Sequence, residues 1–199
     1  MDYQEKKNLY KCRKTVLEML TDRGYPVPEN FNISFDDFLL LLEENNLDLY
    51  LINGEDDSIY VRFLYDYGKN LTEKELGNMK EEIKEITEDP DIKMIFILKI
   101  NPSKNNMETL EKVKNVEVFW QDRLTFNYTK HDLVPQHIPM KPDEIEELLK
   151  LKKWKKSQLP KLSRSDPIAK YYGMKSDDVF KIIRQSESMG EHVAYRHIR

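Results

Sequence analysis

Five consecutive apolar residues stand at Met94-Ile95-Phe96-Ile97-Leu98. A strand that is apolar on both faces is typical of the interior of a parallel sheet, where helices cover both sides. Before it, Thr72 and Glu75 form a capping box at the start of an amphipathic segment that ends at Pro90. After it, a further strand pattern covers residues 116–120. Strands that alternate with helices predict βαβ units, so we assign this half to the α/β class.

The other elements of the first half follow from apolar spacing and turn signals. Leu76, Met79, Ile83 and Ile86 carry the helix that begins at Thr72 as far as Pro90. The remaining predicted elements are a helix through Leu9, Cys12 and Leu20 that Gly24 ends, a helix capped by Ser34, strands at 47–52 and 58–65 joined by Asn53-Gly54, and a short helix near 107–113.

The second half consists of shorter elements joined by turns. One helix begins at Pro142, and another is capped by Ser165 or Asp166, with Pro167 in its first turn and Gly173 at its end. Both helices are too short to be stable alone, so a sheet must hold them. The predicted strands of that sheet are 126–128, 179–184 and 193–198, with Ser188-Met189-Gly190-Glu191 turning the last pair.

The two halves differ in charge. Residues 1–125 contain 17 basic and 26 acidic side chains, whereas residues 126–199 contain 15 basic and 10 acidic ones. This asymmetry predicts that the halves face different partners or each other. We therefore expect an α/β domain at 1–125 and a small mixed-sheet domain with short helices at 126–199, which makes the chain α+β overall. The boundary should lie near residues 121–129, without a Gly- or Pro-rich linker.

Composition argues against several classes of protein. No apolar stretch approaches the roughly 20 residues of a membrane span, and no basic segment followed by an apolar one opens the chain, so we expect no secretory signal. The single cysteine, Cys12, cannot form an internal disulfide, which fits a reducing compartment. Cys12 and the four histidines lack the spacing of a zinc site. No glycine-rich nucleotide loop occurs either, so we expect no cofactor.

One segment could indicate an enzyme. Asp89-Pro90-Asp91-Ile92-Lys93 places a carboxylate and a lysine at the entrance of a strand, as some metal-dependent nucleases do. Such a site needs a second acidic residue to hold Mg²⁺, and Asp56, Asp57 and Asp66 are candidates. The alternative, which we favour, is a charged turn that leads into the core strand.

Two clusters in the second half admit a functional and a structural interpretation. His131 and His137 could form a metal pair or a general base, but no third ligand accompanies them, so packing roles are favoured. The basic run at 150–156 could follow phosphates, with Trp154 stacking on a base or anchoring a protein interface. The alternative is a solvated helix end that complements the helix dipole. Because the first half is acidic, any nucleic-acid contact should be local.

The C-terminal residues resemble a known family. The resemblance rests on four runs in matching order and spacing: His131-Asp132-Leu133-Val134-Pro135-Gln136-His137, Gln158-Leu159-Pro160, Asp166-Pro167-Ile168-Ala169-Lys170-Tyr171-Tyr172-Gly173, and 179–188. These runs are similar to the small H-type subunit of archaeal RNA polymerase and to the end of the fifth-largest subunit shared by the nuclear RNA polymerases. In the first half, residues 19–25 and 35–38 resemble the opening of the eukaryotic form, which adds a domain that the archaeal protein lacks.

This resemblance implies a non-catalytic, two-domain subunit of a multisubunit DNA-directed RNA polymerase. It places the C-terminal domain on the largest subunit, and the N-terminal domain, nuclease-like in fold but without an active site, in the lower jaw near downstream duplex DNA. It also implies a nuclear protein, or one of a viral factory or virion if a virus encodes it. The implied subunit-interface residues are His131, Leu133, Val134, Pro135, His137, Leu159, Pro160, Asp166, Pro167 and Arg184.

One loop of the family faces the DNA and reads Thr-Pro-Ser-Ala. Here Asn101-Pro102-Ser103-Lys104 stands at the equivalent place after the core strand. Lys104 adds a positive charge that could meet a phosphate, although such a contact reads no base sequence. Two alternatives to the polymerase subunit stay open, a stand-alone metal-dependent nuclease and a free transcription adaptor.

Overall fold

The computed structural model describes residues 1–54, 57–66, 71–101, 103, 109–110, 112–186 and 190–199. It divides into two compact units, Met1–Phe126 and Asn127–Arg199. This division lies next to the boundary expected from the sequence, while independent folding of the two units stays a prediction. Residues 107, 108 and 111 of the expected helix near 107–113 and residues 188 and 189 of the expected turn at 188–191 lie outside the described residues.

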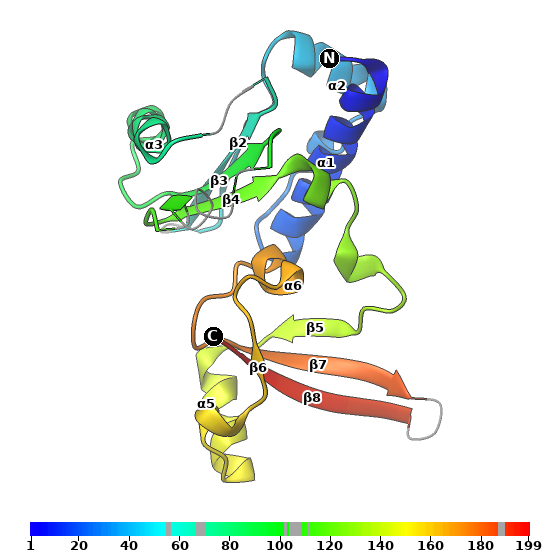
Figure 1. Ribbon diagram of the computed structural model, residues 1–199, viewed down its shortest axis with the longest axis vertical. Coiled ribbons are helices and arrows are strands. Elements are labelled where there is room, and N and C mark those ends of the chain that lie inside the picture. Colours follow the sequence, from blue (N-terminus) through cyan, green and yellow to red (C-terminus); the bar gives the residue numbers. More distant parts are fainter. Residues whose placement is uncertain (55–56, 67–70, 102, 104–108, 111, 187–189) are drawn as a thin grey trace. The chain divides into compact units, whose positions relative to one another are not determined.

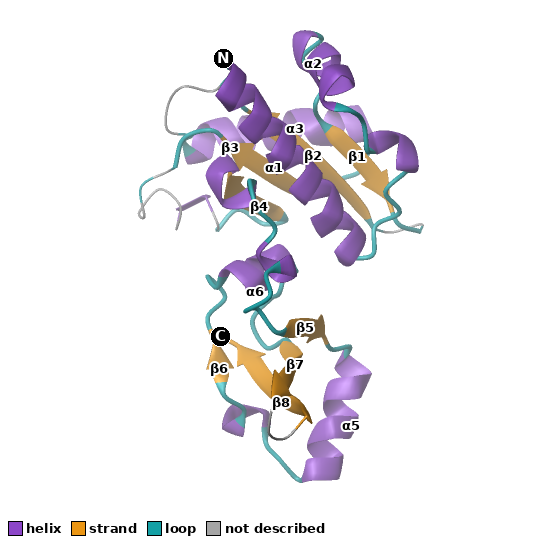
Figure 2. Ribbon diagram, turned by 90° about the vertical axis from the view of Figure 1, so that its right-hand side faces the viewer, coloured by secondary structure: helices purple, strands orange, loops and turns teal. Residues whose placement is uncertain are grey.

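The first unit is built around one four-stranded sheet. The strand order is β1-β2-β3-β4, with β1 antiparallel to β2 and with β2, β3 and β4 parallel. Its elements are α1 (Tyr3–Asp22), the 3₁₀ turn η1 (Glu29–Phe31), α2 (Phe35–Glu43), β1 (Leu49–Ile52), β2 (Ser58–Leu64), α3 (Glu73–Thr87), β3 (Lys93–Leu98), β4 (Val116–Trp120) and η2 (Gln121–Leu124). Figure 2 shows α1 on one face of the sheet and α3 on the other. The α/β prediction is confirmed.

The core of this unit is centred on β3, in which every residue from Met94 to Leu98 is buried. Leu76 and Ile83 of α3 pack against the face of β3 that carries Phe96. Helix α1 buries an apolar stripe that includes Cys12. Ile86 also lies in α3, but it does not join the buried face of that helix, because its side chain is 60% exposed. Since successive helical residues turn by about 100°, Ile86 lies to one side of the line through Leu76 and Ile83.

The predicted helix ends of the first unit are confirmed. The Thr72 hydroxyl accepts a hydrogen bond from the backbone N–H of Glu75 at 3.3 Å, and the Glu75 carboxylate accepts one from the Thr72 N–H at 3.0 Å. Ser34 caps α2 through the N–H of Asp37. Gly24 follows α1 with φ of 91°, a left-handed conformation that costs glycine little. These local signals fix where each helix begins or ends.

The second unit is also built around a four-stranded sheet, in the order β5-β7-β8-β6. Its elements are η3 (Tyr128–Lys130), β5 (Gln136–Pro139), α5 (Pro142–Lys152), η4 (Lys156–Gln158), β6 (Lys161–Leu162), α6 (Pro167–Tyr171), β7 (Val179–Ser186) and β8 (Gly190–Ile198). Only the β6–β8 pair is parallel. Phe180 and Ile182 pack with α6 on one face, and Val179 packs with Ile145 of α5 on the other. The long β7–β8 hairpin dominates this unit (Figure 1).

One strand of the second unit was predicted wrongly. Residues 126–128 form no strand; β5 and β6 complete the sheet instead. The Asn127 side-chain oxygen accepts hydrogen bonds from the N–H and the hydroxyl of Thr129, at 3.0 and 2.6 Å, and its amide donates to the Tyr171 hydroxyl at 3.1 Å. This side chain caps η3, so local hydrogen bonding overrides the strand preference of the flanking Phe126 and Tyr128.

Two isoleucines of α3 test this description of the core. Ile83 is fully buried and Ile86 is 60% exposed. Ile83→Ala should lower the free energy of unfolding by about 2–5 kcal/mol because it leaves a cavity. Ile86→Ala, the matched control, should change it by less than about 0.5 kcal/mol. Urea denaturation followed by far-ultraviolet circular dichroism measures both, and equal losses would contradict the assigned faces of α3.

Candidate functional site

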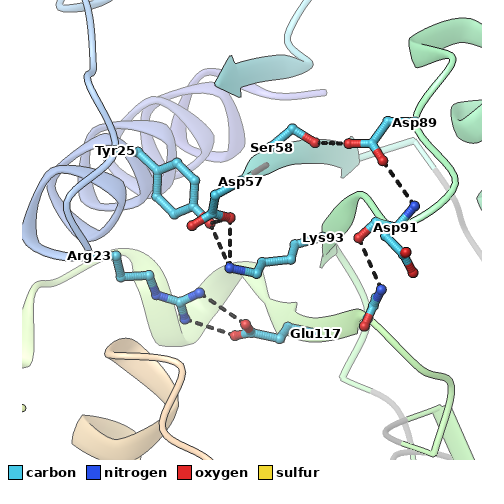
Figure 3. A network of polar contacts seen from close by, with 9 residues as sticks. Arg23, Tyr25, Asp57, Ser58, Asp89, Asp91, Lys93 and Glu117 are labelled. Atoms are coloured by element: carbon cyan, nitrogen blue, oxygen red, sulfur yellow. Dashed lines mark hydrogen bonds and ion pairs between the residues drawn. The ribbon is translucent and has the colours of Figure 1, made fainter. Parts of the chain in front are cut away.

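Lys93, the first residue of β3, directs its ammonium group to Asp57 (Figure 3). Its Nζ lies 2.7 Å from Asp57 Oδ1 and 3.4 Å from the Tyr25 hydroxyl, which donates to the same carboxylate oxygen at 2.9 Å. Burial alone would lower the pKa of Lys93, but its contacts with Asp57 and Tyr25 raise it. Burial and the hydrogen bond to Asp57 raise the pKa of Tyr25. The carboxylate of Asp57 is thus compensated by groups of the chain itself.

The other acidic residues of the motif are directed elsewhere. The Ser58 hydroxyl donates to Asp89, whose second oxygen accepts from the backbone N–H of Asp91 at 2.9 Å (Figure 3). The Asp91 side chain is 83% exposed and lies 3.9 Å from Lys114 Nζ. Asp56 lies outside the described residues, within which no group of three or more His, Cys, Asp or Glu side chains could hold a metal. The arrangement supports the interpretation of a charged turn.

A bidentate ion pair joins the end of α1 to β4. The Arg23 guanidinium donates to both oxygens of Glu117 at 2.8 and 3.0 Å, and the Arg23 side chain is only 7% exposed. Sequence reasoning missed this pair because its members are far apart in the chain. Like Lys93, Glu117 belongs to the amino-terminal part of its strand. The polar network therefore lies at the edge of the sheet opposite to the one where open parallel sheets bind ligands.

The loop after β3 begins at the carboxyl-terminal ends of the parallel strands, where such sheets bind ligands. Asn101 and Ser103, two of the four residues expected near DNA, are exposed. Pro102 and Lys104 lie outside the described residues. The loop therefore starts on the side of the sheet where ligands commonly bind. Its contact with DNA stays a prediction.

The segment His131–His137 of the second unit is held by local hydrogen bonds. His131 Nδ1 accepts from the backbone N–H of Leu133 at 3.1 Å. His137 Nδ1 lies 2.7 Å from the carbonyl oxygen of Pro135, to which it can donate, and its ring meets Phe180 edge-on. Both rings thus have structural contacts, as the packing interpretation expects. Leu133, between them, is 86% exposed, and Val134 packs against the core.

The structure brings several expected interface residues of the second unit into electrostatic reach of one another. Burial lowers the pKa of His137; Asp166 and the Pro135 carbonyl oppose this effect, and Arg184 and Arg196 add to it. Asp166 also caps α6 by accepting from the Ile168 N–H at 2.9 Å. Arg196 was not among the expected interface residues. Its alternation with Ala194 and Ile198 in β8 was the available signal, since alternate residues share one face of a strand.

The remaining expected interface residues take part in the fold of the second unit. Leu159 is buried beside Val179, the carbonyl of Pro160 accepts from the His197 N–H at 2.9 Å, and Pro167 opens α6. In the basic run, Lys150 lies 3.7 Å from Glu146 within α5, and Trp154 is 43% exposed. The lysines at the end of α5 are consistent with a solvated helix terminus.

Comparison with known proteins gives one consistent result along the chain. Residues 3–113 match a family model described as RNA polymerase Rpb5, N-terminal domain, and residues 126–198 match the model for the C-terminal domain. The chain is 32% identical over 210 residues to a Caenorhabditis briggsae protein named DNA-directed RNA polymerases I, II, and III subunit RPABC1, covering 98% of this chain and 97% of that one. A Dictyostelium discoideum protein of the same name is 34% identical over 199 residues, covering 94% and 95%.

The lowered pKa of His137 predicts that the stability of the protein depends on pH. The pKa of this side chain is lowered from the ordinary 6.5 in the folded protein, so on acidification the unfolded chain binds a proton before the folded chain does. Stability should therefore fall as the pH decreases below about 6.5. His137→Gln removes this titration, so the variant should lose less stability between pH 7 and pH 5. Urea denaturation at both values measures the difference, and parallel losses would contradict the assignment.

Proposed function

The chain belongs to the Rpb5 family of RNA polymerase subunits, and from this membership we propose that it joins a multisubunit DNA-directed RNA polymerase without catalytic activity of its own. The observation that carries the proposal is the continuity of the match, since both family models align in order with one chain. The named relatives are also covered almost from end to end. Because those relatives are subunits of polymerases I, II and III, we place this chain in the nucleus, or in a viral factory or virion if a virus encodes it.

The second unit is the part that we propose docks on the largest subunit. Its segment His131–His137 is held by hydrogen bonds of 3.1 and 2.7 Å between its histidine rings and its own backbone, yet it presents Leu133 with 86% exposure. An apolar side chain held outward on a rigid loop suits a protein interface, because little conformational freedom is lost on binding. Arg184 lies close enough to influence His137, which adds a charged group to the same surface.

The first unit is the part that we propose forms the lower jaw near downstream DNA. Its polar side chains at the amino-terminal edge compensate one another, as Lys93 and Asp57 do, which leaves no described cluster arranged for metal-dependent cleavage. This favours the polymerase subunit over the stand-alone nuclease. The acidic excess of this unit also argues that DNA contact is confined to a local feature such as the loop at 101–104.

Two exposed leucines of the second unit test the docking proposal. Leu133 lies in the proposed interface, whereas Leu151, on α5, is 79% exposed and lies outside it. Burying a leucine contributes roughly 1.5–3 kcal/mol, so Leu133→Glu should reduce incorporation at limiting concentration by about tenfold or more. Leu151→Glu carries the same chemical change and should incorporate as the parent chain does.

Affinity purification of tagged full-length variants, with quantification of the largest subunit, measures incorporation. Thermal unfolding of the free variants should show parental stability for both, because both side chains are exposed. Unimpaired incorporation of Leu133→Glu would contradict the proposed interface. Equal loss of incorporation in both variants would contradict it too, because Leu151 lies outside the proposed interface.

The jaw proposal predicts a phosphate contact by Lys104. Removal of one such contact changes the slope of log affinity against log salt by roughly 0.9. Lys104→Ala should therefore weaken the salt dependence of downstream-DNA retention by about that amount, with the exposed Lys112→Ala as control. Retention by an elongation complex over a salt series measures the slope, and identical slopes for Lys104→Ala and the parent would remove this loop from DNA contact.

A further inference from the structure

The outer edge of β8 is largely unpaired. On one side β8 pairs with β7 along its length, from Gly190 opposite Ser186 to His197 opposite Val179. On the other side β6 reaches only His197 and Ile198. Within the described residues, no strand lies along the outward side of residues 190–196. Figure 1 shows the hairpin extending beyond β6. A row of outward-facing backbone N–H and C=O groups is thus left without a strand partner.

This edge carries the charged Glu191 and Arg196 but lacks other features that usually protect such strands. Soluble proteins shorten their edge strands, interrupt them with proline or a bulge, or place lysines along them. Residues 191–196 contain neither proline nor lysine, and their register against β7 continues without a bulge. An open edge of this length in a polymerase subunit is suited to pairing with an extended segment of a neighbouring subunit.

The side chains along the edge specify the chemistry of that segment. His192, Ala194 and Arg196 share one face of β8, and Val193 and Tyr195 share the other with Glu191 at its outer end, because strand residues alternate. The cross-strand partner of His192 is Arg184, which adds to the positive charge of the first face. The Lys150–Glu146 ion pair and the His197–Asp177 hydrogen bond described in this unit use neither arginine. A matching strand would present acidic side chains on the first face and apolar ones on the second.

The edge also adjoins the proposed docking surface. In the β5–β7 register His137 lies opposite Ile182, and in the β7–β8 register Ile182 lies opposite Ala194. His137, Ala194 and Arg196 therefore belong to one face of the sheet. A partner that covers the His131–His137 segment is within reach of this face and of the outer edge of β8.

We propose that an extended segment of the largest subunit, with alternating acidic and apolar side chains, adds as a strand to the outer edge of β8. The inference rests on the proposed docking of the second unit and names the means by which it binds. Backbone hydrogen bonds supply affinity along the edge, and Arg196 selects acidic side chains on one face. The sheet of this unit becomes five-stranded in the polymerase.

Hydrogen exchange on the parent chain tests strand addition directly. Outward-facing amides between Glu191 and Arg196 should exchange at least tenfold more slowly in the purified polymerase than in the free chain. The exposed end of α5, residues 150–152, should exchange at the same rate in both states and serves as the internal control. Stable incorporation with unchanged exchange along β8 would overturn the proposal.

Charge reversal and crosslinking identify the occupant. Arg196→Glu should reduce incorporation at least tenfold, whereas Lys152→Glu, an equal change of charge on exposed α5, should not. Unchanged incorporation of Arg196→Glu would overturn the selection of acidic side chains. A photo-crosslinker at His192 should link to the largest subunit, and a link to any other subunit would overturn the assigned partner. Failure of the parent chain to enter a polymerase at all would instead contradict the proposed function.

Discussion

Burial of β3 on both faces is the constraint on which the first unit depends. A parallel strand that is apolar throughout, as Met94–Leu98 is, must be covered on both sides. This requirement places α1 and α3 on opposite faces of the sheet (Figure 2). The two ends of the strands differ in their surroundings. At the amino-terminal ends of the strands, Lys93–Asp57 and Arg23–Glu117 hold the elements together, while Asn101 and Ser103, which follow the carboxyl-terminal end of β3, are exposed.

The second unit solves a different problem, because its helices are short. α6 spans only Pro167–Tyr171 and cannot be stable alone. It depends on the Asp166 cap and on packing against Phe180 of the long hairpin. The same hairpin supplies Arg184 and Arg196 to the surface beside His137. The β7–β8 hairpin thus contributes both to the stability of this unit and to its proposed binding surface.

Sequence reasoning succeeded where signals were local or strongly periodic. The Thr72–Glu75 capping box, the apolar run of β3 and the Pro142 helix start each determine structure within a few residues, and all are present. It failed at residues 126–128, where one asparagine side chain overrides strand preference. The Arg23–Glu117 pair and the free edge of β8 depend on tertiary pairing, which one sequence does not encode locally.

The central claim is that this chain is a constitutive structural part of a polymerase rather than a free adaptor or a nuclease. The most direct test is native mass spectrometry of the complex purified through a tag on the largest subunit, from the cells in which this chain is made. We predict that the chain is present at one copy for each largest subunit, and that the ratio persists through high-salt washing. A substoichiometric amount that washes away would contradict the claim and favour the free adaptor.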